Sequence, residues 1–149
     1  NLSEGRGTDM PFRYIGAPWL NSKKLISELE RRDLKGVKFH KIQFIPRFLP
    51  NKAEYPKYID ETCNGVEIII TDRKQASSLL IAINLIEIIK TLHPNEFKFN
   101  ADNFIDNLYG SSELRENIMV SDNPIETLVE KWLEDENKFK QSRKPFLIY

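Results

Sequence analysis

The chain of 149 residues has a single cysteine, Cys63, and no excess charge of either sign, since 22 basic side chains balance 22 acidic ones. One cysteine cannot form an internal disulfide or the cysteine cluster of a structural zinc site. Zero net charge excludes a protein that coats nucleic acid through bulk positive charge. No apolar stretch reaches the roughly 18 residues that a membrane span needs. What remains is a globular domain, since 40% of the residues are hydrophobic.

The signatures of common catalytic sites are also missing. The sequence has no His-Glu-x-x-His, no Gly-x-Ser-x-Gly, no phosphate-binding P-loop and no dinucleotide-binding fingerprint. The two histidines, His40 and His93, fall on a predicted strand and at a predicted helix end, whereas a metal site needs three or four converging ligands. We therefore expect no metal ion and no cofactor. Cys63 precedes an Asn-Gly turn and is interpreted as a small buried hydrophobic residue rather than a nucleophile.

The neutral total hides an uneven distribution of charge. Residues 1–75 carry 14 basic and 10 acidic side chains, whereas residues 76–149 carry 8 and 12. If the first half lines a binding site, that site favours anions. The basic stretch 35–58 also contains aromatic residues, which could stack on single-stranded nucleic acid. Because its charge excess is local and modest, we do not expect a nucleic acid partner.

The order of the predicted elements favours an α+β fold. Strands and helices do not alternate regularly, and the helices cluster toward the C-terminal half, which favours a small mixed or antiparallel sheet packed with about five helices. Residues 1–19 are expected to be irregular, and residues 47–62 form a long loop. The predicted helices cover residues 22–35, 77–92, 100–109, a segment from 111 or 112 through 118, and a last helix from 124; the predicted strands cover residues 37–45, 66–71 and 146–149.

Two local patterns carry particular information. Asn21 and Asn123 stand where helix-capping residues are expected, Gly36 is a helix stop, and Pro124 occupies a favoured first helical position. In the strand at residues 37–45 the apolar alternation changes phase, because two apolar residues (Val37, Phe39) share one face and two later ones (Ile42, Phe44) share the other. Either a β-bulge or burial of both faces would explain this change.

The most unusual motif is Ser-Glu-Gly-Arg-Gly-Thr at residues 3–8. Its two glycines allow the backbone to turn sharply and to approach a ligand closely. Glu4 could act as a general acid or base, or bind a sugar hydroxyl, and Arg6 could bind a carboxylate with two parallel hydrogen bonds. A tight turn with an internal Glu4–Arg6 ion pair accounts for the same residues equally well.

Several segments together resemble a known bacterial family. They are Asn-Leu-Ser-Glu-Gly-Arg-Gly-Thr at 1–8, Pro-Phe at 11–12, Gly-Ala-Pro-Trp at 16–19, Gly-Val at 36–37, Phe39, Phe-Ile-Pro at 44–46, Lys-Ala at 52–53, Cys-Asn-Gly-Val at 63–66 and Phe-Leu-Ile-Tyr at 146–149. In this order they resemble the C-terminal part of the NamZ-like (YbbC-like) exo-β-N-acetylmuramidases, a family long catalogued as a domain of unknown function. The likeness extends over essentially the whole chain.

The resemblance implies that residues 1–149 form one domain, the C-terminal domain of a longer two-domain protein. In the family a Rossmann-like N-terminal domain precedes it, and the active site lies in the cleft between the two. Because the sequence begins with Asn rather than Met, we expect that N-terminal domain to be missing here. The family releases N-acetylmuramic acid from the non-reducing ends of peptidoglycan, which implies muramyl saccharides as substrates and a periplasmic or secreted, bacterial location.

The resemblance also implies roles for individual residues. Glycoside hydrolysis usually needs two carboxylates. Glu4 is the catalytic candidate in this chain, and the principal acid is expected outside it, so the chain alone should be inactive. Arg6 is a natural partner for the lactyl carboxylate of N-acetylmuramic acid, with Ser3, Thr8 and Asn1 as further substrate-binding candidates. Weaker candidates are Trp19, Arg47 and Lys52. The rival interpretation is a non-catalytic module that binds glycan or packs against its N-terminal partner.

Overall fold

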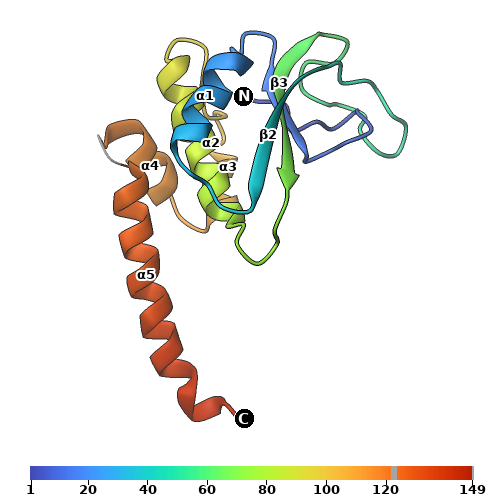
Figure 1. The fold of residues 1–149 in the computed structure, drawn as a ribbon. Coiled ribbons are helices and arrows are strands. Elements are labelled where there is room, and N and C mark those ends of the chain that lie inside the picture. Colours follow the sequence, from blue (N-terminus) through green and yellow to red (C-terminus); the bar gives the residue numbers. More distant parts are fainter. Residues whose placement is uncertain (122–123, 149) are drawn as a thin grey trace. The chain divides into compact units, whose positions relative to one another are not determined.

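The computed structural model describes residues 1–121 and 124–148. The chain forms two compact units, Asn1–Asn100 and Ala101–Tyr149, and each is described by itself. The predicted α+β class is confirmed, because the described residues contain a three-stranded antiparallel sheet and five α-helices (Figure 1). None of the helices in this part of the chain combines the length and the apolar character needed to cross a membrane.

The sheet lies in the first unit. Its strands are β1 (Tyr14–Ala17), β2 (Val37–Phe44) and β3 (Cys63–Ile70). The central strand β3 pairs antiparallel with β1 on one side and with β2 on the other. Much of two loops, residues 1–13 and 45–62, lies on the opposite side of the sheet from the helices (Figure 1), whereas Leu2 and Tyr58 of these loops pack against the helix-side core. The sheet therefore has side chains to bury on both faces.

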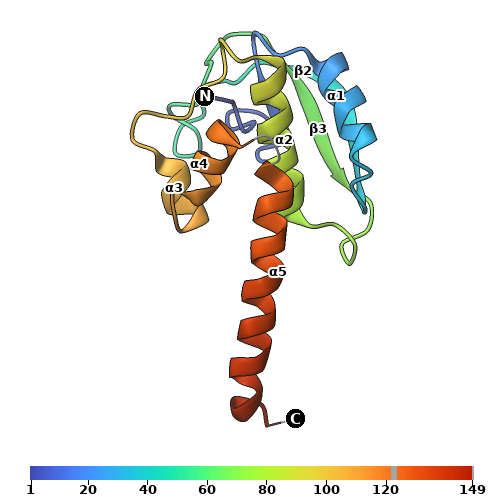
Figure 2. The ribbon, with the colours of Figure 1, turned by 90° about the vertical axis from the view of Figure 1, so that its left-hand side faces the viewer.

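Helices α1 (Ser22–Arg31) and α2 (Ser78–Leu92) cover one face of the sheet (Figure 2). Burying each of the large aliphatic side chains between them stabilises the unit by about 2 kcal/mol. The buried core residues on this side are Ala17, Leu20, Leu25, Leu29, Val66, Ile81, Leu85, Ile88, Ile89 and Phe97.

The change of phase in β2 comes from burial of both faces. Val37 and Phe39 pack against the helix-side core. Phe44 is buried on the other face, where its ring lies 5.5 Å from that of Tyr14. The register runs without interruption from the first residue of β2 to the last, so there is no bulge. Of the two explanations left open by the sequence, burial of both faces is confirmed.

The second unit is helical. It contains α3 (Phe104–Tyr109), α4 (Glu113–Val120), α5 (Pro124–Arg143) and a 3₁₀ helix, η1 (Lys144–Phe146). Among its described residues, the buried apolar side chains are those of Leu114, Ile118, Pro124 and Leu128. The Trp132 indole nitrogen of α5 donates to the Tyr109 hydroxyl of α3 at 2.6 Å. Short helices thus pack on the start of a longer one.

Two sequence predictions are wrong. Residues 14–17 were expected to be irregular but form β1, because their strand structure comes from pairing with β3 rather than from local propensity. Residues 146–149 were expected to form a strand. The structure instead has a 3₁₀ turn from Lys144 to Phe146, and its middle residue is a proline whose fixed φ suits a helical first turn. Leu147 and Ile148 have no regular structure, and Tyr149 lies outside the described residues.

Smaller corrections concern element ends. The helix predicted for residues 22–35 ends at Arg31, because Asp33 has a positive φ of 47°. Gly36, predicted as the helix stop, lies five residues farther on and directly precedes β2. The strand predicted for 66–71 begins three residues earlier, and the helix predicted for 100–109 begins at Phe104. Asn21 caps α1 and Pro124 opens α5 as predicted, whereas the predicted cap Asn123 lies outside the described residues.

Candidate functional site

The Ser-Glu-Gly-Arg-Gly-Thr turn (residues 3–8) is held against the edge of the sheet. Ser3 forms an isolated antiparallel bridge with Gly16 of β1. The Ser3 nitrogen donates to the Gly16 carbonyl at 2.8 Å, and the Gly16 nitrogen donates back at 3.0 Å. Ser3 itself is 1% exposed. The first residue of the motif is therefore a fixed anchor for those that follow.

The two glycines of the turn are required by its geometry. Gly5 and Gly7 have positive φ values of 75° and 81°, which side-chain-bearing residues rarely adopt. A Cβ at Gly5 would lie 2.9 Å from the Cβ of Tyr14, and a Cβ at Gly7 would lie 2.5 Å from the Arg47 carbonyl oxygen. The sharp turn predicted from the two glycines is present. Its close contacts lie within the protein, between Gly5 and Tyr14 and between Gly7 and the 45–62 loop.

Both hydroxyls of the motif are engaged inside the turn. The Ser3 hydroxyl accepts a hydrogen bond from the Gly5 nitrogen at 3.3 Å. The Thr8 hydroxyl donates to the Gly5 carbonyl at 2.6 Å and accepts from the Met10 nitrogen at 3.2 Å. These bonds fix the path of the backbone between the glycines. Ser3 and Thr8, proposed from the sequence as substrate-binding residues, thus have structural partners.

Asn1 is likewise tied to the protein rather than free. Its side-chain nitrogen donates to the Glu96 carbonyl at 2.7 Å, and its side-chain oxygen accepts from the Lys98 nitrogen at 2.8 Å. Its carbonyl oxygen accepts from the Tyr58 hydroxyl at 2.8 Å. The Asn1 amide therefore joins the start of the motif to the segment that follows α2.

Glu4 and Arg6 are the two charged residues of the motif, and both side chains reach the surface. They are 40% and 51% exposed, and the Arg6 Nε lies 4.0 Å from the Glu4 Oε1. The backbone of Glu4 is fixed, because its carbonyl accepts from the Phe12 nitrogen at 2.7 Å. A carboxylate and a guanidinium thus stand side by side on a rigid turn, where they can contact a hydroxyl and an anionic group of one ligand.

The 45–62 loop supports this turn. The sequence predicted a long loop here but not its contacts with the turn. Its Arg47 nitrogen donates to the Gly7 carbonyl at 2.8 Å, and its Arg47 side chain pairs with Asp60 at 2.5 Å. Tyr58, which sequence reasoning missed, accepts from the Trp19 indole at 3.1 Å. The sequence signal that could have identified Tyr58 is its position in a long loop rich in aromatic residues.

The weaker candidates have ordinary structural roles. Trp19 packs against His93, with ring centroids 5.2 Å apart, and Lys52 is exposed. Cys63 is buried, as predicted, and burial raises the pKa of its thiol to about 11. Among the described residues, no three histidine, cysteine or acidic side chains converge on a point that could hold a metal ion.

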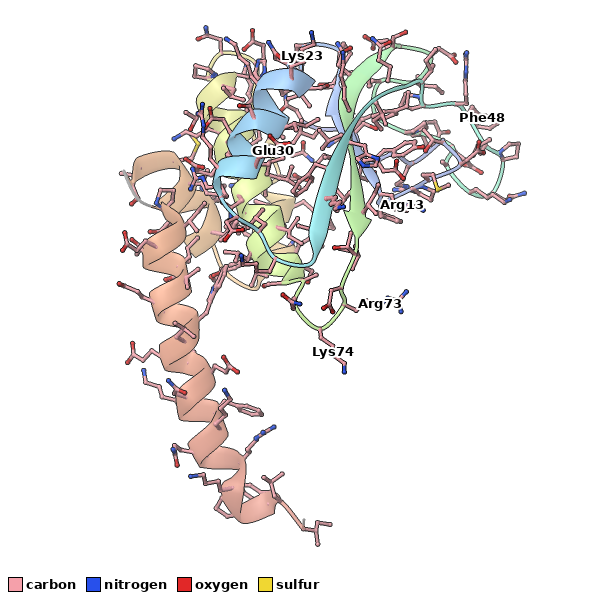
Figure 3. The ribbon with its side chains drawn as sticks, viewed as in Figure 1. Arg13, Lys23, Glu30, Phe48, Arg73 and Lys74 are labelled. Carbon is pink, nitrogen blue, oxygen red and sulfur yellow. The ribbon has the colours of Figure 1, made fainter. Side chains whose placement is uncertain are left out.

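Aromatic rings are exposed on the two loops that form and support the turn. Phe12 in the first loop is 74% exposed, and Phe48 and Tyr55 in the second are 52% and 92% exposed. Figure 3 shows Phe48 at the outer edge of the 45–62 loop. Exposed rings of this kind provide flat apolar surfaces on the loops that form and support the turn.

Comparison with known proteins identifies the family. Residues 1–149 match the family described as "Exo-beta-N-acetylmuramidase NamZ, C-terminal". The chain belongs to the NamZ C-terminal family. The resemblance read from the sequence is thereby confirmed over the whole chain.

Individual NamZ relatives agree with this assignment. The chain is 32% identical, over 149 residues, to the "Peptidoglycan beta-N-acetylmuramidase NamZ" of Bacillus subtilis (strain 168). It is similar to two crystal structures of DUF1343 family proteins from Bacteroides fragilis NCTC 9343. The first has a TM-score of 0.82 at 27% identity, and the second has a TM-score of 0.57 at 25% identity.

The alignments cover nearly all of this chain but about a third of each relative. The alignment covers all of this chain and 34% of the Bacillus subtilis protein. It covers 99% of this chain in both crystal structures, and 38% and 36% of those chains. The chain thus spans about a third of the length of the relatives it matches.

Proposed function

We propose that this chain is the C-terminal domain of an exported peptidoglycan glycosidase that releases N-acetylmuramic acid from non-reducing ends. In this proposal the domain forms one wall of a cleft, and a Rossmann-like N-terminal domain of the same protein forms the other. The enzyme acts in the periplasm or outside the cell during wall turnover. The 32% identity to a peptidoglycan β-N-acetylmuramidase supports the reaction class.

One observation carries the assignment of the site to this domain. Glu4 and Arg6 are exposed, adjacent and held on a turn whose other polar groups are internally bonded. A turn built only to connect two segments has no need of two oppositely charged side chains on either side of a glycine. The arrangement is suited to presenting these two side chains to a ligand.

The chemistry of the pair matches the proposed substrate. N-acetylmuramic acid carries a lactyl carboxylate, and a guanidinium can bind a carboxylate with two parallel hydrogen bonds. Arg6 therefore binds the lactyl group, while Glu4 holds a sugar hydroxyl or exchanges a proton during hydrolysis. Since glycosidases use two carboxylates, the N-terminal domain supplies the principal acid and the isolated chain is inactive.

A second candidate function is a non-catalytic module that binds glycan or packs against its N-terminal partner. The internal bonds of Ser3, Thr8 and Asn1 favour it, because these residues stabilise the turn rather than face a ligand. In this function the Glu4–Arg6 pair would stabilise a domain interface. Loss of the pair would then weaken domain packing without a specific effect on catalysis.

The two functions are distinguished in the full-length protein. Glu4→Gln and Arg6→Gln variants are compared with the wild type for release of N-acetylmuramic acid from muramyl saccharides, and for thermal unfolding. The proposed site predicts a large loss of activity with little change in the unfolding temperature. Near-wild-type release by both variants would exclude Glu4 and Arg6 from the site.

A further inference from the structure

Phe12 combines two properties that a residue with a purely structural role does not need. Its side chain is 74% exposed, so the ring contributes little to the core. Its backbone has a positive φ of 64°. A positive φ is rare for a bulky residue, and residues held in such conformations cluster at functional sites. Neither packing nor local preference therefore explains the presence of a phenylalanine at this position.

The positive φ of Phe12 belongs to a tight turn over residues 10–13. The Arg13 nitrogen donates to the Met10 carbonyl at 3.2 Å, which closes the turn, and Pro11 has a fixed φ at its second position. When a turn has proline second and a positive φ third, glycine or asparagine is the usual third residue, because both tolerate this φ. The turn would therefore form more easily without the ring of Phe12.

This turn is attached through its backbone to the motif at residues 3–8. The Phe12 nitrogen donates to the Glu4 carbonyl at 2.7 Å. Beside this bond the two turns touch, because a Cβ at Gly5 would lie 3.0 Å from the Met10 carbonyl oxygen. The fold therefore fixes the backbone of Phe12 next to that of Glu4 before any ligand arrives. A site that needs little reorganisation binds its ligand more tightly.

An exposed ring on a turn that is bonded to Glu4 matches the chemistry of a sugar acid. One face of a hexopyranose consists of C–H groups, and such an apolar face stacks on an aromatic ring. The hydroxyl and carboxylate groups at the edge of the same sugar need polar partners, which Glu4 and Arg6 can supply. Glu4 is 40% exposed and Arg6 is 51% exposed, so these two side chains and the Phe12 ring are all open to solvent.

We propose that Phe12 is the aromatic platform of the sugar site. Its ring stacks on the C–H face of N-acetylmuramic acid, while Arg6 binds the lactyl carboxylate and Glu4 holds a hydroxyl. This inference rests on the glycosidase function proposed above and adds a substrate-binding residue to it. Because the ring contacts the sugar equally in the ground state and in the transition state, its loss raises KM and leaves kcat nearly unchanged.

Three variants of the full-length protein separate the effect of the ring from that of the backbone. Phe12→Asn removes the ring and gives the turn a residue that tolerates a positive φ. Phe12→Tyr keeps a ring of the same size. Leu79→Gln is the control, because it removes a 41% exposed apolar side chain from α2, which covers the other face of the sheet (Figure 2). Ligand-observed NMR measures binding of N-acetylmuramic acid, and KM, kcat and the unfolding temperature are measured alongside.

We expect Phe12→Asn to weaken binding and to raise KM about tenfold, the effect of losing one stacking contact of an aromatic ring, with little change in kcat. Its unfolding temperature should equal or exceed that of the wild type, because asparagine suits the turn. Unfolding would then not account for the lost affinity. Phe12→Tyr should stay within a factor of about two of the wild type in binding and KM, because the ring remains. Leu79→Gln should do the same, as a surface substitution outside the site.

The measurements distinguish failure of this inference from failure of the glycosidase function. Unchanged binding and KM in Phe12→Asn would overturn the inference and leave the glycosidase function intact. An equal loss in Phe12→Tyr would also overturn it, because the ring would not be the responsible group. Absence of saturable binding of N-acetylmuramic acid by the wild type would overturn it as well. Binding that depends on Phe12, in a wild type that releases no N-acetylmuramic acid, would support the platform and contradict only the glycosidase function.

Discussion

The backbone nitrogen of Arg47 donates to the carbonyl oxygen of Gly7 at 2.8 Å. This bond joins the turn that carries Glu4 and Arg6 to the 45–62 loop, two segments that are about forty residues apart in the sequence. Their contact is so close that no side chain fits between them at Gly7. The placement of the exposed charged pair therefore depends on a glycine that packs against the 45–62 loop.

Gly7→Ala should destabilise the first unit by about 2–3 kcal/mol, because the new Cβ would combine a positive φ with overlap on the Arg47 carbonyl. Gly110→Ala is the control: Gly110 also has a positive φ, but nothing lies within 4 Å of its Cβ position. We expect it to cost only about 1 kcal/mol in its own unit. Hydrogen exchange resolved by segment measures both. An equal effect of the two substitutions would refute the close-contact explanation.

Tyr58→Phe should lower the free energy of unfolding by about 1–3 kcal/mol. The Tyr58 hydroxyl accepts from the Trp19 indole and donates to the Asn1 carbonyl, so its loss leaves two part-buried groups without a partner. Tyr55→Phe, in the same loop, removes a hydroxyl from a side chain that is 92% exposed and should have no measurable effect. Urea unfolding followed by tryptophan fluorescence tests this pair, and indistinguishable midpoints for the two variants would contradict the assigned contacts.

The buried thiol of Cys63 predicts a pH dependence at high pH. Burial, with the Glu61 charge as a smaller contribution, raises its pKa from 9 to about 11. The unfolded thiol loses its proton near pH 9 and the folded one only near 11, so the stabilisation from this group is complete below 9 and falls as the pH rises toward 11. The difference in unfolding free energy between the wild type and Cys63→Ala should shrink over this range. A constant difference would show that the thiol titrates normally.

Arg115 should stabilise the second unit through a paired contact with α3. Its Nε and Nη2 lie 3.0 and 2.7 Å from the two carboxylate oxygens of Asp106, and this pairing raises the pKa of the guanidinium. Arg115→Gln should therefore speed hydrogen exchange in α3 and α4. Lys138→Gln removes an exposed intrahelical pair with Glu134 and should leave exchange in α3 and α4 unchanged. Unaltered exchange in Arg115→Gln would mean that the contact contributes nothing.

Local signals in the sequence were sufficient to predict most helices and to select Glu4 and Arg6 as candidate residues. Asn21 marks a helix start through its capping side chain, and Gly110 marks a helix end through its backbone freedom. In the structure α1 begins after Asn21 and α3 ends before Gly110. The turn at residues 3–8 was also recognisable, because two closely spaced glycines indicate a sharp bend. These features depend on neighbours within a few residues.

Features that depend on distant partners could not be predicted in this way. The strand at Tyr14–Ala17 exists because β3 lies beside it, and two of its four residues, Gly16 and Ala17, are disfavoured in strands. The bonds of Asn1 to residues 96 and 98 cannot be inferred from its flanking sequence. For the same reason, the sequence kept Ser3, Thr8 and Asn1 as further site candidates behind Glu4 and Arg6, although their polar groups are bound internally.

The most direct test of the account is the catalytic efficiency of the full-length protein carrying Glu4→Gln. Asp9→Asn is the matched control, because it neutralises an exposed carboxylate in the same loop. The account predicts that Glu4→Gln lowers kcat/KM for release of N-acetylmuramic acid by about 100-fold or more, the effect of losing an acid–base group, while Asp9→Asn stays near the wild type. Wild-type efficiency in Glu4→Gln, with the fold intact, would contradict it.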